Sequence, residues 1–381
     1  MTTDREELYN TLCSIISNHS LNELGILPAI PDEAERSTNE YYPFIFLENN
    51  LGIPLPVVHH IIAYSSSEFM KHRQQKDQKN LEDLELSSKV LFMVNPDHYS
   101  AANTRKSLVQ SNIVDAQKEL ALVDLMFTIP KHSKSSIAWH HRKWIQNYLI
   151  KEKGQALDFD REFSLCERTA TLYPRNYYAW TYRSWLLTRI PHIKRHEEYE
   201  RSRQWVASHI SDHSGLQHLQ RCLRLSLGTL HIKVHLSWLR EQLKRYPGHE
   251  SLWCHLRYCA YLAAAKKVLE YKTEPAFIED VLKICKDSDV EDENIQKQLQ
   301  LALRYGLWIT HLVEHYGLGD ADLRAWADLA MHMYTKELEK LADQSTFYKL
   351  FQGWSCHAAK KQQATSSEYY KRLPSDGDNE A

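Results

Sequence analysis

The chain has 381 residues, 43% of them hydrophobic and 25% charged, which is the composition of an ordinary globular protein. A formal net charge of −2 gives no electrostatic footprint for a nucleic-acid partner. No apolar run approaches the roughly 20 residues that cross a bilayer, so no membrane span is expected. Seven scattered cysteines without a CxxC pair, and an acidic N-terminal helix in place of a signal peptide, predict a cytoplasmic protein with reduced thiols.

In chain order, residues 1–80 predict an N-terminal segment that packs on the rest, with helices near 4–18 and 56–75. Residues 20–55 between them are interpreted as irregular, with a short apolar segment at 42–47. A regular rhythm of paired helices fills residues 81–267. An acidic run at 286–293 predicts a linker, residues 268–363 predict capping helices near 294–316, 321–342 and 344–362, and residues 364–381 predict a disordered tail. The helix pairs are expected at 81–94 with a helix carrying Arg105, 113–129 with 135–152, 158–172 with 177–190, 196–210 with 215–228, and 231–245 with 250–267.

A degraded tryptophan–arginine motif marks the second helix of each pair, and we call its residues the repeat signature. The arginines are separated by 37, 41, 38 and 36 residues, and three of them follow a tryptophan by three or four positions. Such a period without strand signals predicts stacked helical hairpins. The fold class is therefore expected to be all-α, a right-handed alpha-alpha superhelix of about five hairpins with flanking helices. The signature residues are Arg105, Trp139, Arg142, Trp180, Arg183, Arg221, Trp253 and Arg257.

The simplest interpretation of this motif is structural. Tryptophan buries a large apolar area, and arginine offers a planar fork of donors to helix-end carbonyls or to a carboxylate. Histidine pairs four residues apart, such as His231 and His235, have the spacing of zinc-binding helices but lack an obvious third ligand. No metal site is therefore predicted in this chain.

The pattern P-x-N-Y-x-x-W-x-x-R resembles the alpha-subunit repeat of protein prenyltransferases. The match is clearest in PRNYYAWTYRSW at 174–185 and covers roughly residues 81–267. The first and fourth copies depart from it, with Ala102 and His218 at the tryptophan positions. The wording HSKSSIAWHHRKW of the second copy is most similar to a divergent, repeat-containing branch of that family.

This resemblance implies the alpha subunit of a heterodimeric enzyme that is inactive alone. The enzyme would transfer an isoprenoid, with geranylgeranyl favoured, from its diphosphate to a C-terminal cysteine of a substrate protein. The implied partner is a beta subunit, with the Rab geranylgeranyltransferase type favoured, that carries the zinc and the isoprenoid pocket. No cofactor is expected in this chain itself.

The resemblance also implies candidate site residues. Lys134 matches the lysine that contacts the diphosphate leaving group in the family, although Ser136 replaces the family's tyrosine beside it. A cation at the start of a helix suits a developing negative charge, whereas a solvated lysine beside a helix cap is the plain alternative. The other candidates for the substrate cleft are Arg175, Asn176, Tyr177 and Tyr178, with Asn176 more readily explained as a helix cap.

Two other kinds of function stay open at this point. A non-catalytic adaptor could use the same helical repeats to bind partner proteins, and the eroded first and fourth copies fit the loss of an ancestral partner surface. RNA-binding helical repeats form the third class, which the near-neutral charge disfavours.

Overall fold

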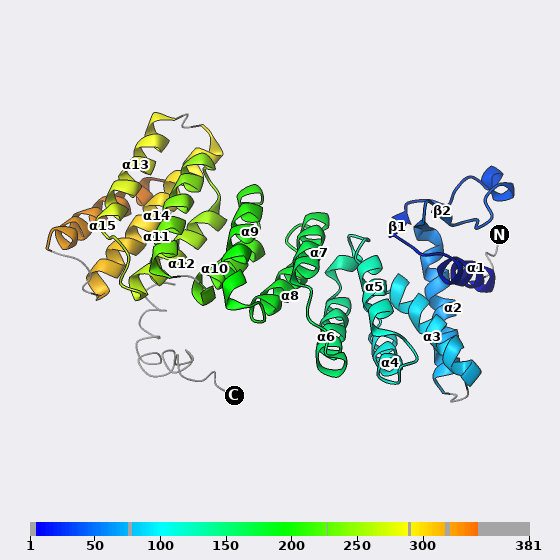
Figure 1. The fold of residues 1–381 in the computed structure, drawn as a ribbon. Coiled ribbons are helices and arrows are strands. Elements are labelled where there is room, and N and C mark those ends of the chain that lie inside the picture. Colours follow the sequence, from blue (N-terminus) through cyan, green and yellow to red (C-terminus); the bar gives the residue numbers. More distant parts are fainter. Residues whose placement is uncertain (1–4, 75–77, 227, 289–290, 317–320, 342–381) are drawn as a thin grey trace. The chain divides into compact units, whose positions relative to one another are not determined.

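The computed structural model describes residues 5–74, 78–226, 228–288, 291–316 and 321–341. The chain forms two compact units, Met1–Ser226 and Leu227–Ala381 (Figure 1). The boundary between them falls inside the 81–267 stretch expected to hold the repeats. Each unit consists mainly of helices packed against their neighbours in sequence.

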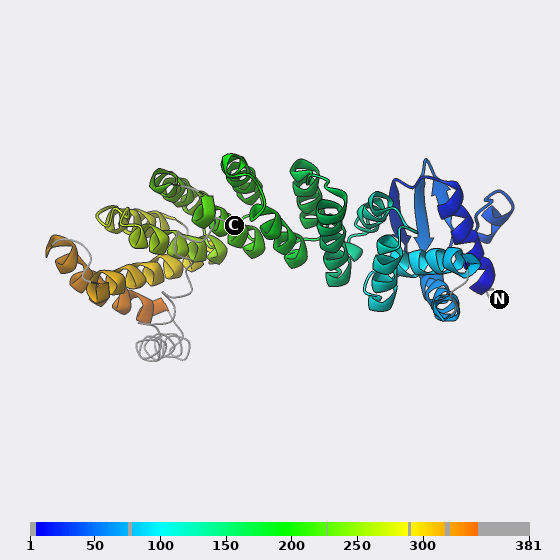
Figure 2. The same cartoon turned by 60° about the horizontal axis from the view of Figure 1, so that its bottom comes forward.

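Unit 1 begins with two helices that flank a small sheet, α1 (Arg5–Asn18) and α2 (Leu55–Arg73). The strands β1 (Glu23–Leu27), β2 (Ile45–Leu47) and β3 (Asn50–Pro54) are ordered β1-β3-β2, with β1 parallel and β2 antiparallel to β3. The expectation of an irregular segment at 20–55 was therefore wrong. The strands are too short to show a clear period, and they are held by tertiary contacts. The Thr128 hydroxyl bonds both the N–H and the C=O of Leu24, and β1 contacts the later helix α5 (Ala116–Met126) (Figure 2).

Four helical hairpins follow in unit 1, which confirms the predicted pairing of helices. In each hairpin a first helix is followed by a second helix that carries the repeat signature. We call this second helix the inner helix. Most of their ends fall within about three residues of the predicted ones. The hairpins are α3 (Gln78–Val94) with α4 (Tyr99–Gln110), α5 with α6 (Ser136–Lys153), α7 (Phe159–Leu172) with α8 (Tyr177–Leu187), and α9 (Arg195–Ser208) with α10 (His213–Ser226).

Local sequence sets where these helices begin and end. Asp115 and Asp158 accept hydrogen bonds from backbone N–H groups in the first turns of α5 and α7. Helix α6 ends at Gly154, whose φ of 63° lies in the left-handed region that glycine adopts without strain. Pro174 follows α7 closely, as predicted, because proline cannot continue the helical ladder.

The described residues of unit 2 form the fifth hairpin and three further helices. Helices near 294–316 and 321–342 are confirmed, but a helix at 273–287 was missed, and it extends into the start of the run predicted as an acidic linker. The expected helix at 344–362 and the tail at 364–381 lie outside the described residues. Within the part of the chain that the structure describes, no helix combines the length and apolar character that crossing a bilayer requires. The helices are α11 (Thr229–Arg245), α12 (Glu250–Ala265), α13 (Thr273–Asp287), α14 (Glu293–Tyr316) and α15 (Ala321–Leu341).

Candidate functional site

Three signature arginines each form a two-point ion pair with a glutamate on the first helix of the following hairpin. In the middle pair, Nε and Nη2 of Arg142 donate to the carboxylate of Glu162 over 2.8 and 2.6 Å. Both side chains are fully buried, so the hydrogen bonds between them replace those that each charged group would make with water. The sequence suggests two kinds of partner for the signature arginines, helix-end carbonyls or a carboxylate. These three arginines bind a carboxylate. We call the three pairs arginine clamps: Arg105–Glu119, Arg142–Glu162 and Arg183–Glu198.

Each clamp glutamate also meets a side chain from the inner helix of its own hairpin. Burial alone would raise the pKa of Glu119, but the charge of Arg105 and the hydrogen bond with His141 hold that pKa at about 2. Burial also lowers the pKa of His141 and favours the neutral imidazole. One glutamate thus joins two successive hairpins. The second contacts are His141 to Glu119 at 2.7 Å, Tyr182 to Glu162 at 2.6 Å and His218 to Glu198 at 2.7 Å.

The position of His218 corrects the predicted register of the fourth hairpin. His141 stands directly before Arg142 in the chain, so the residue after His218 occupies the arginine position of the fourth copy. That residue is Leu219, which is fully buried, whereas Arg221 is exposed. Arg221 is therefore not part of a clamp. The prediction chose position 221 because it holds an arginine, but the position equivalent to Arg142 holds a leucine.

The fifth hairpin needs the same correction. His255 contacts His235 of α11 in the way that His218 contacts Glu198, so Leu256 stands at the arginine position. Leu256 lies three residues after Trp253, which restores the spacing of the other copies. Arg257 is only half-buried and forms no clamp. The extra residue that the motif shows between tryptophan and arginine is thus explained.

Unit 2 contains a glutamate clamp that the sequence analysis did not predict. Glu274 of α13 accepts hydrogen bonds from Arg240 of α11 over 2.5 Å and from the Tyr305 hydroxyl of α14 over 2.9 Å. In the same unit the indole N–H of Trp253 donates to Gln298 over 2.9 Å. Arg240 lies on a first helix, outside the repeat signature, so no motif could have identified it.

The loops before the inner helices α6 and α8 are bonded to each other. Asn176 caps α8 by accepting from the N–H of Ala179, and its Nδ2 donates to the carbonyl of Ser133 over 2.7 Å. The indole N–H of Trp139 donates to the same carbonyl over 2.7 Å. Asn176 is fully buried by these contacts. It is therefore a cap and a cross-link, and we remove it from the candidate cleft.

Lys134 lies on the surface beside this cross-link. It ends the short 3-10 helix η2 (His132–Lys134), directly before Ser135, the N-cap of α6. Its Nζ donates to the Tyr173 hydroxyl over 3.2 Å and lies 4.8 Å from the centre of that ring. The structure thus places an exposed cation at the positive end of a helix, an arrangement suited to an anion.

The remaining cleft candidates lie at the start of α8. Tyr177 is 60% exposed and Tyr178 is half-buried, and their rings meet edge to face with centroids 5.5 Å apart. Arg175 is exposed and has a φ of 60°. Because Tyr173 joins the end of α7 to Lys134, the exposed polar groups before α6 and α8 belong to one continuous surface. We call Lys134, Tyr173, Arg175 and Tyr177 the inner-helix surface.

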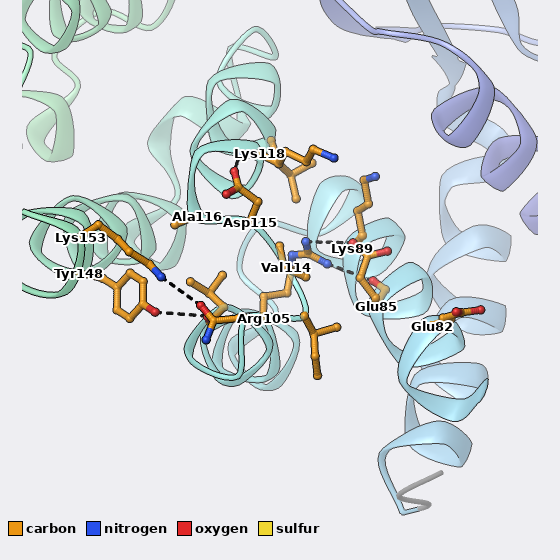
Figure 3. A pocket seen from close by; sticks show the side chains of 14 residues that line it. Glu82, Glu85, Lys89, Arg105, Val114, Asp115, Ala116, Lys118, Tyr148 and Lys153 are labelled. Atoms are coloured by element: carbon orange, nitrogen blue, oxygen red, sulfur yellow. Dashed lines mark hydrogen bonds and ion pairs between the residues drawn. The ribbon is translucent and has the colours of Figure 1, made fainter. Parts of the chain in front are cut away.

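A separate pocket of about 580 Å³ lies between α3, α4, α5 and the loop that joins α4 to α5 (Figure 3). Its walls carry both signs of charge, and Arg105 faces it while bound to Glu85 and Glu119. Lys153 donates to Asn112 over 3.0 Å. None of the predicted cleft residues lines this pocket, so it is distinct from the inner-helix surface.

Known structures share this architecture. A chain of the Candida albicans protein geranylgeranyltransferase-I complexed with GGPP superposes with a TM-score of 0.50 at 15% identity, and the match covers 75% of this chain and 89% of that one. This likeness concerns the fold alone. The protein is a helical-repeat protein with the alpha-alpha superhelix fold, as expected from the sequence.

Sequence comparison identifies the family. The protein prenyltransferase alpha subunit repeat matches residues 116–149, 159–190 and 233–263. The zebrafish (Danio rerio) protein prenyltransferase alpha subunit repeat-containing protein 1 is 30% identical over 300 residues, or 64% of this chain and 69% of that protein. The geranylgeranyl transferase type-2 subunit alpha of Dictyostelium discoideum is 26% identical over 122 residues, 30% of this chain and 38% of that one. The chain belongs to the family of protein prenyltransferase alpha subunit repeat-containing proteins.

Proposed function

We propose that this chain is the alpha subunit of a heterodimeric protein prenyltransferase that transfers geranylgeranyl to a C-terminal cysteine of a substrate protein. Family membership and the similarity to a geranylgeranyl transferase type-2 subunit alpha support this proposal. The partner is a beta subunit of the Rab geranylgeranyltransferase type. The beta subunit supplies the zinc that favours the substrate thiolate and the pocket for the isoprenoid.

The catalytic part of the proposal depends on the position of Lys134, which is an exposed cation just before the start of α6. In the reaction the cysteine sulfur forms a bond to C1 of the isoprenoid, the C–O bond breaks, and diphosphate leaves with the bonding electrons. An ammonium at the N-terminal end of a helix stabilises this departing charge. The contact with Tyr173 uses one N–H of Lys134 and leaves two for diphosphate oxygens.

The experiment is to co-express the chain with a Rab-type beta subunit, purify the pair and measure transfer of labelled geranylgeranyl. For Lys134→Ala we expect kcat to fall by about 10²–10³-fold, the usual effect of removing one charge-stabilising donor. Lys131→Ala is the matched control, since Lys131 is also exposed and lies three residues earlier. We expect it to leave kcat unchanged and both variants to bind the beta subunit as tightly as the wild type.

Two outcomes would contradict the proposal in different ways. Pairing with full activity of Lys134→Ala would remove Lys134 from the reaction but keep the subunit assignment. Failure to bind any prenyltransferase beta subunit would favour the non-catalytic adaptor, in which the helical repeats bind partner proteins without chemistry.

A further inference from the structure

A group of histidine and cysteine side chains lies buried in unit 2. His235 comes from α11, and His255 and Cys259 lie one turn apart on α12; all three are fully buried. The two Nε2 atoms are 2.8 Å apart, and the sulfur of Cys259 is 3.6 Å from Nε2 of His255. The three donor atoms all lie within 4.8 Å of one another.

The preceding hairpin has a different set of residues at the same repeat positions. The residues 37 positions before His235, His255 and Cys259 are Glu198, His218 and Cys222. There Arg183 binds the carboxylate through Nε and Nη2, at 2.7 and 3.0 Å, so the donors form a closed ionic network. Thus Glu198 is already neutralised and needs no metal ion.

At the next step along the sequence neither member of the ionic pair is present. Leu219, on α10 of the fourth hairpin, stands at the arginine position, and His235, on α11 of the fifth hairpin, stands at the glutamate position. Among the described residues, the group that could hold an ion here consists of two imidazoles and a thiol.

This donor set matches the chemistry of a thiophilic ion. Bond lengths of about 2.0–2.1 Å to nitrogen and 2.3 Å to sulfur place N and S about 3.6 Å apart around a tetrahedral centre, which agrees with the observed distance. The imidazole nitrogens would need to separate by roughly 0.5 Å. The described residues supply three donors, fewer than the four of a structural zinc site, and a His₂Cys set also suits copper.

We propose that His235, His255 and Cys259 form a structural metal site that binds one thiophilic d¹⁰ ion, Zn²⁺ or Cu⁺. The ion joins α11 to α12, as the Glu198–His218 contact joins α9 to α10. On binding, Cys259 becomes a thiolate and its proton passes to solvent. The site does not depend on the proposed prenyltransferase activity.

The test uses the reduced full-length chain and Co²⁺ as a spectroscopic probe. We expect one equivalent of Co²⁺ to bind with a thiolate charge-transfer band in the near ultraviolet, and Zn²⁺ to abolish the band by displacement. Cys259→Ser should lose the band and bind Co²⁺ at least tenfold more weakly. Cys222→Ser, the same repeat position in the preceding hairpin, is the matched control and should keep both.

A second arm separates the two ions and does not require a variant to fold. Zn²⁺ and Cu⁺ are each titrated into the wild type against a chromogenic chelator, and the thermal midpoint is recorded with and without the ion. Binding of either ion at one equivalent with a raised midpoint supports the site and identifies the ion. A wild-type chain with no thiolate band and no midpoint shift, or equal loss of the band in Cys222→Ser and Cys259→Ser, would overturn it.

Discussion

A fully buried guanidinium such as that of Arg142 is compatible with the interior only because its partners replace water. Glu162 is equally buried, so each charge depends on the other. Replacing both by apolar residues can be tolerated, whereas removing one leaves an unpaired charge. Where leucine occupies the arginine position, at Leu219, the glutamate position is occupied by His235. Both members of the ion pair are therefore absent together, as this rule requires.

Removal of one clamp arginine gives a direct test at the residue scale. For Arg142→Ala we expect the free energy of unfolding to fall by about 3–5 kcal/mol, because Glu162 is left buried and unpaired. Arg221→Ala, at an arginine that the motif includes but the clamps do not, should change it by less than about 0.5 kcal/mol. Urea denaturation followed by circular dichroism measures both, and equal effects would refute the corrected register.

The clamp glutamates also predict how stability depends on pH. The pKa of Glu119 is about 2 in the folded protein against an ordinary 4.5, and that of His141 is lowered from 6.5. The unfolded chain therefore takes up protons that the folded chain does not, and stability present at neutral pH is lost on acidification. The histidine contributes as the pH falls below about 6.5, and the glutamate below about 4.5.

We expect the urea midpoint to fall from pH 7 towards pH 3, more steeply below about pH 4.5. Glu119→Gln lacks the titrating carboxylate, so its midpoint should start lower and change less over the acidic range. A midpoint that rises on acidification would show that other groups dominate.

At the scale of elements, the hairpins depend on caps that also reach the neighbouring hairpin. Asn176 both begins α8 and bonds the carbonyl of Ser133 before α6. The start of one inner helix is thereby fixed relative to the next. This explains how a loop of few residues positions Lys134 and Tyr173 on the inner-helix surface.

Asn176→Ala should remove both functions at once. We expect the free energy of unfolding to fall by about 1–3 kcal/mol, from the lost cap and the lost hydrogen bond to Ser133. Tyr177→Ala, one residue later but 60% exposed, is the control and should have little effect. Thermal melts compare the two, and similar stability losses would argue against the cross-link.

At the scale of the whole molecule, the division into two units predicts where damage spreads. Each repeat contacts mainly its neighbours, so a local defect destabilises the adjoining helices most. Hydrogen exchange of Arg142→Ala should therefore accelerate in α5–α8 and stay unchanged in α12–α15. An equal acceleration throughout would show that both units unfold as one.

The sequence alone determined the helical hairpins, their order and the family. Apolar periodicity, Pro174 and the cap at Asn176 act over a few residues, so they can be read locally. The exposed position of Lys134 next to a helix start also followed from local signals. Function was predicted through resemblance, because the pattern of Trp180 and Arg183 by itself indicates packing.

Only the tertiary structure decided which residues meet. The pairing of β1 with β3, the clamp at Glu274 and the contact of His235 with His255 join segments 20 or more residues apart. Arg221 is exposed, and the arginine position of that copy holds the buried Leu219, which the motif did not reveal. A side chain's partner depends on how helices pack, and neighbouring sequence does not record that packing.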